Sequence, residues 1–303
     1  PKKSDANIME VTSAPTYTDV FGKTVVKICR MYPNVVGITA AMADGTGLKY
    51  LAKEMPERFF DVGIAEQHAV TMAAGLALNG CKPIVAIYSS FLQRAYDQII
   101  HDVAIQKIPV FFCLDRAGLV GADGPTHHGA LDLSYLRCIQ NMVIMAPKDE
   151  NELKDMIYTG VNYDKGPIAV RFPRGNGLGV TIKDEFEKLK IGKAETIQDG
   201  QDAAIIAVGA MIEHAVKASK LLLQEGYTIR IINPRFIKPL DENMLFEVCR
   251  DFEDIVTLED NVLMGGFGSG VLETIYASAF IDKFQKKDKN FSGKISKLRL
   301  ERL

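Results

Sequence analysis

Hydrophobic and polar positions in the first half of the chain predict strands separated by helices. Apolar residues recur on one helical face from Tyr17 to about Met31, and Pro33 ends that pattern. Strands are expected at VVGITA, CKPIVAIYS, IPVFFCLD, NMVIMAP and GPIAVRFP, with helical patterns at 65–79, 91–106 and 149–161. This alternation favours right-handed crossovers and a mainly parallel sheet, so polar residues at the strand ends gather along one edge.

The pattern changes between residues 176 and 190. The glycine-rich RGNGLGV gives way to the charged KDEFEKLK, and a new series begins with strands at AAIIAVGA, TIRIINPRF and DIVTLED and helices at 211–225, 241–250 and 268–281. The predicted fold class is α/β with two domains, each a mainly parallel sheet flanked by helices. The expected division is a flexible lead over 1–15, a first domain over 16–175, a linker over 176–190 and a second domain over 191–303.

Composition limits the possible partners. The 303 residues are 47% hydrophobic, enough for two cores, and 36 Lys and Arg against 38 Asp and Glu give no general electrostatic reason to bind nucleic acid or an anionic membrane. No apolar run approaches the roughly 20 residues of a membrane span, and the five cysteines are scattered without metal-binding spacing. We expect a cytoplasmic protein with reduced thiols, no nucleic-acid partner, no membrane partner, and a solvated lysine-rich tail from Lys283 onward.

The stretch RFFDVGIAEQHAVTMAAGLALNG, residues 58–80, sets Glu66, Gln67 and His68 side by side where a strand passes into a helix. An isolated glutamate here would ordinarily be an acidic first-turn residue favoured by the helix macrodipole. The apolar surroundings, however, leave Glu66 few obvious charge partners in the sequence. A carboxyl shielded from water at a strand end is suited to proton transfer, so Glu66 is a candidate catalytic residue.

A second motif, YSSFLQRAYDQIIHD, ends a strand and opens a helix, with Ser89 or Ser90 expected as the N-cap. Tyr88 and Phe91 fit ordinary core packing. Arg94, three residues after Phe91, is expected on the same helical face, so an aromatic platform lies beside a cation. That pairing suggests a planar ligand bearing negative charge.

The loop DRAGLVGADGPTHHGALD, residues 115–132, carries four glycines together with Arg116, Asp123, His127 and His128. Long loops with such residues in compact domains are typically functional. Adjacent histidines point apart, so a metal pair is not expected, whereas one histidine can act as an acid, a base or a hydrogen-bond donor.

Another strand end, RFPRGNG, supplies Arg171 and Arg174 beside flexible backbone. Arginine suits the geometry of phosphate, although a surface arginine held in a salt bridge explains the pattern equally well.

Several segments, in one order, resemble the family of 1-deoxy-D-xylulose-5-phosphate synthases, which depend on thiamine diphosphate. They are GIAEQHAVTMAAGLA, YSSFLQRAYDQIIHDVAIQK, DRAGLVGADGPTHHGALDLSYLRC and RFPRGN, with INPRFIKPLD and LEDNVLMGGFGSGV in the second domain. The resemblance covers the C-terminal half of that family's polypeptide, its pyrimidine-binding and transketolase C-terminal-like domains. The other half provides the GDG…N motif for magnesium and the cofactor's diphosphate, and no GDG occurs among these 303 residues.

The resemblance implies roles for the residues singled out above. Glu66 matches the carboxylate that contacts N1′ of the aminopyrimidine and promotes the imino tautomer that removes the thiazolium C2 proton. Phe91 matches the residue that stacks on the pyrimidine, and Ile64 is a candidate for the apolar wedge that bends the cofactor. The remaining expectations are Tyr88, Arg116 and Arg174 at the acceptor's phosphate, Asp123 and His127 near the reacting carbons, Arg94 lining the pocket, no role for His128 and no metal ligand in this chain.

The implied reaction condenses pyruvate with D-glyceraldehyde 3-phosphate to 1-deoxy-D-xylulose 5-phosphate and carbon dioxide. This transferase reaction is the first step of non-mevalonate isoprene biosynthesis and also serves thiamine biosynthesis. The expected cofactors are thiamine diphosphate and Mg²⁺, the latter bound mainly by the N-terminal domain. The chain is expected to form a homo-oligomer, as a dimer, and to be inactive until that domain is supplied as a separate chain or as a segment lost from this one.

Three alternatives remain open from the sequence. A transketolase and the β subunit of a 2-oxo-acid dehydrogenase share the fold and the glutamate, but the arginines and the GADGPTHHG loop favour the synthase. A non-enzymatic regulatory fragment would have no need for the combination of Glu66, Phe91, Arg116, His127 and Arg174.

Overall fold

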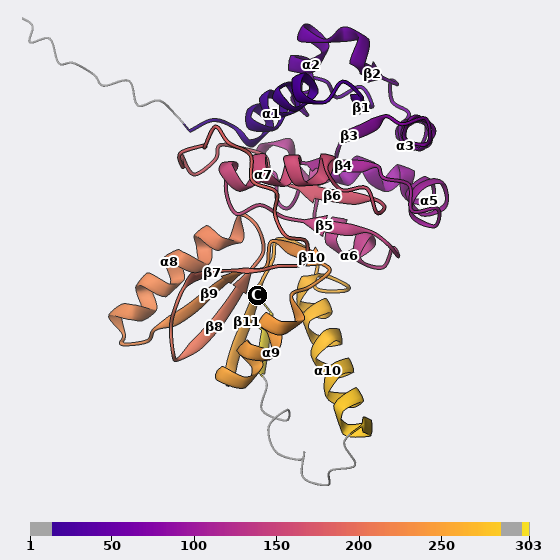
Figure 1. Ribbon diagram of the computed structural model, residues 1–303. Helices are drawn as coiled ribbons and strands as arrows, with labels where there is room; N and C mark the ends of the chain where they lie inside the picture. The colour runs from indigo at the N-terminus through magenta and orange to yellow at the C-terminus, as the bar shows by residue number, and fades with distance from the viewer. Residues whose placement is uncertain (1–13, 286–298, 303) are drawn as a thin grey trace, which may run out of the picture.

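The computed structural model describes residues 14–285 and 299–302, which form two α/β units built on separate sheets (Figure 1). The flexible lead expected over 1–15 and the lysine-rich tail expected from Lys283 lie mostly outside these residues. Within them, no helix combines the length and the apolar character needed to cross a membrane.

The first unit follows the predicted alternation of strands and helices. Its strands are β1 (Val35–Thr39), β2 (Phe59–Asp61), β3 (Lys82–Tyr88), β4 (Phe111–Asp115), β5 (Val143–Met145) and β6 (Ile168–Arg171). Its α-helices are α1 (Tyr17–Met31), α2 (Lys49–Glu54), α3 (Glu66–Leu78), α4 (Ser89–Leu92), α5 (Tyr96–Gln98), α6 (Asp132–Arg137) and α7 (Glu150–Val161), with 3₁₀ turns at Pro56–Arg58, Gln93–Ala95, Gly121–Asp123 and Pro125–His127 and a π-helical segment at Ile99–Ala104.

The sheet of the first unit has seven strands in the order β10-β5-β6-β4-β3-β1-β2, where β10 (Phe236–Lys238) comes from later in the chain. All neighbours except β10 and β5 run parallel. Helices α1 and α7 cover one face, where Phe21 and Met156 belong to the same apolar cluster. Helix α3 and the segment from α5 onward cover the other face. The carboxyl ends of the parallel strands therefore lie along one edge between these layers, as expected.

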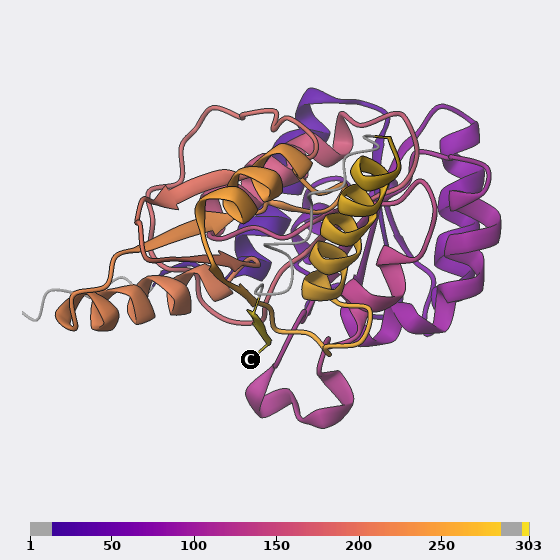
Figure 2. The same ribbon diagram turned by 90° about the horizontal axis from the view of Figure 1, so that it is seen from below.

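The second unit contains β7 (Glu195–Gln198), β8 (Ala203–Ala207), α8 (Met211–Gln224), β9 (Ile229–Asn233), β10 (Phe236–Lys238), α9 (Glu242–Asp251), β11 (Asp254–Leu258), α10 (Phe267–Gln285) and β12 (Arg299–Arg302). Its own sheet has five strands in the order β12-β11-β8-β9-β7, with β7 antiparallel to β9. Helix α8 lies on one side of this sheet and α9 and α10 on the other (Figures 1 and 2). The predicted fold class is confirmed.

Three local expectations were wrong. TIRIINPRF does not form one strand: β9 ends at Asn233, and β10 pairs with β5 of the other sheet because Pro234 and a left-handed Arg235 redirect the chain. The helix expected over 91–106 is divided into α, 3₁₀ and π segments. The serine N-cap is also wrong, because α4 begins at Ser89 itself after an extended Tyr88, which places both serines inside the first turn.

Candidate active site

A hollow of about 450 Å³ opens at the carboxyl ends of β1, β2 and β3. It is lined by Ala40, Ala41, Met42, Ile64, Glu66, Ser90, Phe91 and Arg94. Glu66 is the first residue of α3 and is only 4% exposed, whereas Ile64 on the rim is 76% exposed. A shielded carboxylate and an open apolar rim thus face the same space.

Asp61, at the end of β2, holds the backbone of two segments beside this hollow. Its carboxylate accepts hydrogen bonds from the backbone N–H groups of Ala41, at 2.7 Å, and Gly63, at 3.0 Å. Gly63 has a φ of +69°, a conformation that glycine adopts without strain. The chain can therefore turn sharply after β2 and start α3 with Glu66 pointing inward.

Glu66 has a charge partner from another segment of the chain. Arg94 lies with Nη1 3.5 Å from Glu66 Oε2, although its own side chain is half exposed. Arg94 lies 28 residues after Glu66, in the helical segment that follows β3, so a short sequence window around Glu66 does not contain it. The contact is long for a hydrogen bond, so Glu66 keeps an oxygen free to meet a ligand.

Three rings from two segments form an aromatic patch beside the hollow. The Tyr88 and Phe91 rings stack with centroids 5.6 Å apart. The His127 ring meets Phe91 edge-on at 5.0 Å and Tyr88 at 6.2 Å. The loop after β4 therefore folds back over the end of β3 and brings an imidazole against the Phe91 and Tyr88 rings.

Two arginines lie next to this patch and share one carboxylate. The Arg116 guanidinium lies over the Tyr88 ring, 4.3 Å from its centroid. Asp123 accepts from Arg116 Nε at 3.4 Å with one oxygen and contacts Arg174 Nε at 3.0 Å with the other. Arg116 Nη1 also lies 3.2 Å from Asp115 Oδ1, so two carboxylates accompany the two guanidinium groups. The corner therefore suits a phosphate through its guanidinium N–H donors and not through excess positive charge.

Asp115 contacts Arg116 and was not identified as a site residue from the sequence. Asp115 is buried at the end of β4, and its Oδ2 accepts from the Thr18 hydroxyl at 2.7 Å while Oδ1 accepts from the Arg116 N–H at 2.6 Å. Burial raises the pKa of Asp115 to about 6, and the Arg116 charge and the hydrogen bonds oppose that rise. The pair Asp-Arg directly after an apolar strand is the sequence signal that could have identified it.

Gly45 was also not identified as a site residue from the sequence. Its carbonyl accepts from Arg116 Nη1, and a Cβ at this position would lie 1.7 Å from the Tyr88 hydroxyl oxygen. Only glycine therefore allows the backbone to approach both side chains.

Other residues named from the sequence are not part of this cluster. Arg171 is buried and pairs with Asp132 and Asp260, so it is not available to an anion. The His128 Nδ1 accepts from the Val120 N–H at 3.1 Å, which holds the loop together. In the part of the chain that the structure describes, no group of three or more His, Cys, Asp or Glu side chains is arranged to hold a metal ion.

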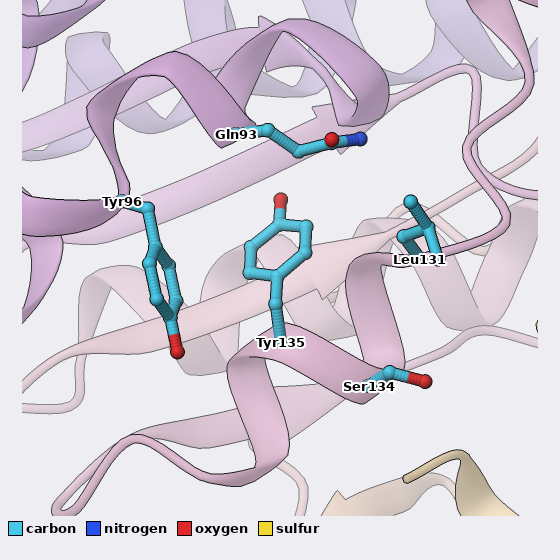
Figure 3. A pocket seen from close by; sticks show the side chains of 5 residues that line it. All are labelled: Gln93, Tyr96, Leu131, Ser134 and Tyr135. Carbon is cyan, nitrogen blue, oxygen red and sulfur yellow. The ribbon is translucent and has the colours of Figure 1, made fainter. Parts of the chain in front are cut away.

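A second hollow of about 390 Å³ lies elsewhere along the divided helix and is lined by Gln93, Tyr96, Leu131, Ser134 and Tyr135 (Figure 3). The Tyr135 hydroxyl points toward Gln93 between Tyr96 and Leu131. None of the residues singled out from the sequence as site residues lines it. Those residues gather instead around the first hollow and the adjoining arginines.

Comparison with known proteins gives two family matches that together cover most of the chain. Residues 13–178 match the transketolase pyrimidine-binding domain, and residues 192–296 match the transketolase C-terminal domain. Curated relatives include 1-deoxy-D-xylulose-5-phosphate synthases from Thermosynechococcus vestitus, 57% identical over 86% of this chain and 41% of the relative, and Syntrophus aciditrophicus, 59% identical over 86% and 40%. The chain thus spans about two-fifths of the length of these relatives.

Solved structures give the same fold. One is a split-gene transketolase described as an inactive β4 tetramer, with a TM-score of 0.78, 29% identity and coverage of 87% of this chain and 86% of that one. Another is a mutant transketolase from Pichia stipitis, with a TM-score of 0.69, 19% identity and coverage of 82% and 39%, which supports the fold alone. The resemblance drawn from the sequence motifs is confirmed.

Proposed function

The chain belongs to the transketolase family, with that family's pyrimidine-binding and C-terminal domains, and from this premise we propose that it is the C-terminal half of a 1-deoxy-D-xylulose-5-phosphate synthase. The proposed reaction condenses pyruvate with D-glyceraldehyde 3-phosphate and releases carbon dioxide. The main support is the position of a buried carboxylate and a pair of arginines on two sides of one aromatic patch.

The first hollow fits the aminopyrimidine ring of thiamine diphosphate. Glu66 offers a carboxylate screened from water, Phe91 offers a ring face, and Ile64 and Met42 offer apolar walls. Bound thiamine diphosphate supplies a carbon nucleophile and an electron sink. In this proposal Glu66 holds a proton at a ring nitrogen, and its shielding from water strengthens that hydrogen bond.

The aromatic patch and the two arginines beside it fit the acceptor. Arg116 and Arg174 bind the phosphate dianion, while Asp123 holds their guanidinium groups in place and offsets part of their charge. His127, edge-on to Phe91, is placed to give a proton to the acceptor's carbonyl oxygen. Arg94 lines the hollow and holds one oxygen of Glu66.

The remaining half of the site is proposed to come from an N-terminal diphosphate-binding domain that also binds Mg²⁺. The split-gene transketolase chain, which this chain matches over 86% of its length, was solved as an inactive β4 tetramer. We propose that this chain likewise self-associates, is inactive alone and gains activity when the N-terminal half is present.

The test combines the chain with that half, either as its accompanying protein or by grafting this chain onto the N-terminal part of the Thermosynechococcus vestitus relative. With Mg²⁺, thiamine diphosphate, pyruvate and D-glyceraldehyde 3-phosphate, we expect 1-deoxy-D-xylulose 5-phosphate. Glu66→Gln should reduce the rate by about 10²–10⁴-fold, the usual contribution of a proton-transfer group, whereas Gln67→Asn, at the exposed next position, should not.

Two results would contradict the proposal: a folded, assembled complex that forms no product, or equal rates for wild type and Glu66→Gln. Transketolase chemistry is the second candidate, because a split-gene transketolase covers nearly the same length of chain. Product formed from a ketose phosphate donor but not from pyruvate would favour it.

A further inference from the structure

A turn of the second unit, residues 260–266 after β11, lies against the loop 116–128 of the first unit and the start of α6. The Val262 N–H donates to the Ala130 carbonyl at 2.8 Å. Ser134 receives a hydrogen bond from the Asn261 side chain at 2.8 Å and donates to the Met264 carbonyl at 2.7 Å. The second unit is thus bonded to the chain immediately after the loop that carries Arg116, Asp123 and His127.

Asp260, the first residue of this turn, packs on the base of the same loop. A Cβ built on Gly118 would lie 1.9 Å from Asp260 Oδ2, so the carboxylate rests directly on the Gly118 backbone. Gly118, with a φ of +72°, donates to the Gly129 carbonyl at 2.9 Å and accepts from the Gly129 N–H at 2.8 Å. These two hydrogen bonds join the two ends of the loop, and the Asp260 carboxylate packs against the Gly118 backbone at that junction.

The other oxygen of Asp260 accepts from Arg171 Nη1 at the end of β6. Arg171 is 3% exposed and also donates to Asp132, from Nε at 3.1 Å and from Nη2 at 3.3 Å. Burial raises the pKa of Asp132, and the Arg171 charge opposes that rise. Since Asp132 begins α6 just beyond the loop, Arg171 fixes the far end of the loop while Asp260 fixes its base.

We propose that Asp260 is a positioning residue for the acceptor-binding loop. It touches no substrate; by holding Gly118 and Arg171 it fixes the positions of Arg116 and His127. The predicted effect on catalysis rests on the proposed function. The predicted effect on the loop's structure rests only on the contacts between the two units. Asp260 thereby gives the second domain a part in binding the phosphorylated acceptor.

The structural consequence is measured without activity, by amide hydrogen exchange on the full chain. Asp260→Ala should speed exchange at Gly118 and Gly129 by about tenfold or more, the effect expected for losing one hydrogen bond to a charged group. Asp260→Asn should give a smaller increase, because an amide keeps the packing but not the charge. Asp254→Asn, an exposed position at the start of β11, is the matched control and should change nothing at the loop.

Unchanged exchange over 116–129 in both Asp260 variants would overturn the inference, and so would an equal increase across the strands of both sheets. If Asp260→Ala does not fold, Asp260→Asn decides alone.

The catalytic consequence is measured on the enzyme assembled with its N-terminal half. Both Asp260 variants should raise the KM for D-glyceraldehyde 3-phosphate by about tenfold, because loosening Arg116 weakens phosphate binding. They should also lower kcat, because loosening His127 slows proton transfer, and should leave the KM for pyruvate unchanged. Equal changes for both substrates would indicate a general structural defect and overturn the inference. If the wild-type assembly is inactive the proposed function fails, while the exchange measurement still decides whether Asp260 holds the loop.

Discussion

Replacing Asp115 with asparagine tests whether the carboxyl next to Arg116, the arginine proposed to bind the acceptor's phosphate, is held out of water. Asp115 is fully buried and accepts from the Thr18 hydroxyl and the Arg116 backbone. Burial raises its pKa from the ordinary 3.8 to about 6. Asparagine has nearly the same shape but does not ionise, so it removes whatever pH dependence the carboxyl contributes.

The sign and the size follow from the direction of the pKa change. A carboxyl whose pKa is higher in the folded than in the unfolded chain binds its proton more tightly when folded. Its stabilising contribution is fully present below pH 3.8 and is lost as the pH rises through about 6. Because one pKa unit corresponds to about 1.4 kcal/mol, the free energy of unfolding of the wild type should fall by about 3 kcal/mol relative to Asp115→Asn between about pH 4 and pH 7.

The assay is urea unfolding across this pH range, followed by far-ultraviolet circular dichroism because the chain has no tryptophan. Differences between wild type and variant remove the titration of groups common to both. Asp44→Asn is the control, since the Asp44 side chain is 91% exposed. A pH-independent difference for Asp115→Asn, like that expected for Asp44→Asn, would refute the reasoning that the Asp115 carboxyl is held out of water.

Two further substitutions test other contacts. Gly45→Ala should raise the KM of the assembled enzyme for the phosphorylated acceptor by about 10–100-fold. The new methyl would lie 1.7 Å from the Tyr88 hydroxyl oxygen, and a clash of this kind costs about 1–3 kcal/mol. An unchanged KM would contradict this prediction. Glu150→Gln should lower the free energy of unfolding by about 2–3 kcal/mol, because the buried carboxylate accepts backbone N–H groups of residues 178–180 at 2.9, 2.6 and 2.9 Å. Urea unfolding measures this loss, with Glu213→Gln, a substitution of a side chain that is 41% exposed, as the control. Equal stability of the two variants would contradict the prediction.

Elements governed by local pattern were predictable from the sequence. Helix α1 begins and ends where the apolar period and Pro33 place it, and the Thr16 side chain caps it by accepting from the Asp19 N–H at 3.0 Å. Strand β4 is buried along its whole length and reads as a continuous apolar run. In both cases the residues that decide the structure are adjacent in the chain.

Contacts between distant segments were not predictable in this way. Arg94 contacts Glu66 across 28 residues of sequence, and the burial of Arg171 depends on Asp260 of the second unit, 89 residues away. Periodicity carries no information about either, so Arg171 and Arg174 looked alike in the sequence. Most residues proposed for the site stood out from motifs at strand ends, and the family resemblance gave them roles. The structure brings them together, and their roles remain predictions.

The edge of the first sheet is completed by β10, which pairs with β5 although it follows the strands of the second unit. A nascent chain can therefore finish its first sheet only after Lys238 has left the ribosome, when much of the second unit has also been made. Cleaving the chain before Phe236 would leave the backbone of β5 open to pairing with strands of other molecules, so the first unit released in this way would tend to aggregate.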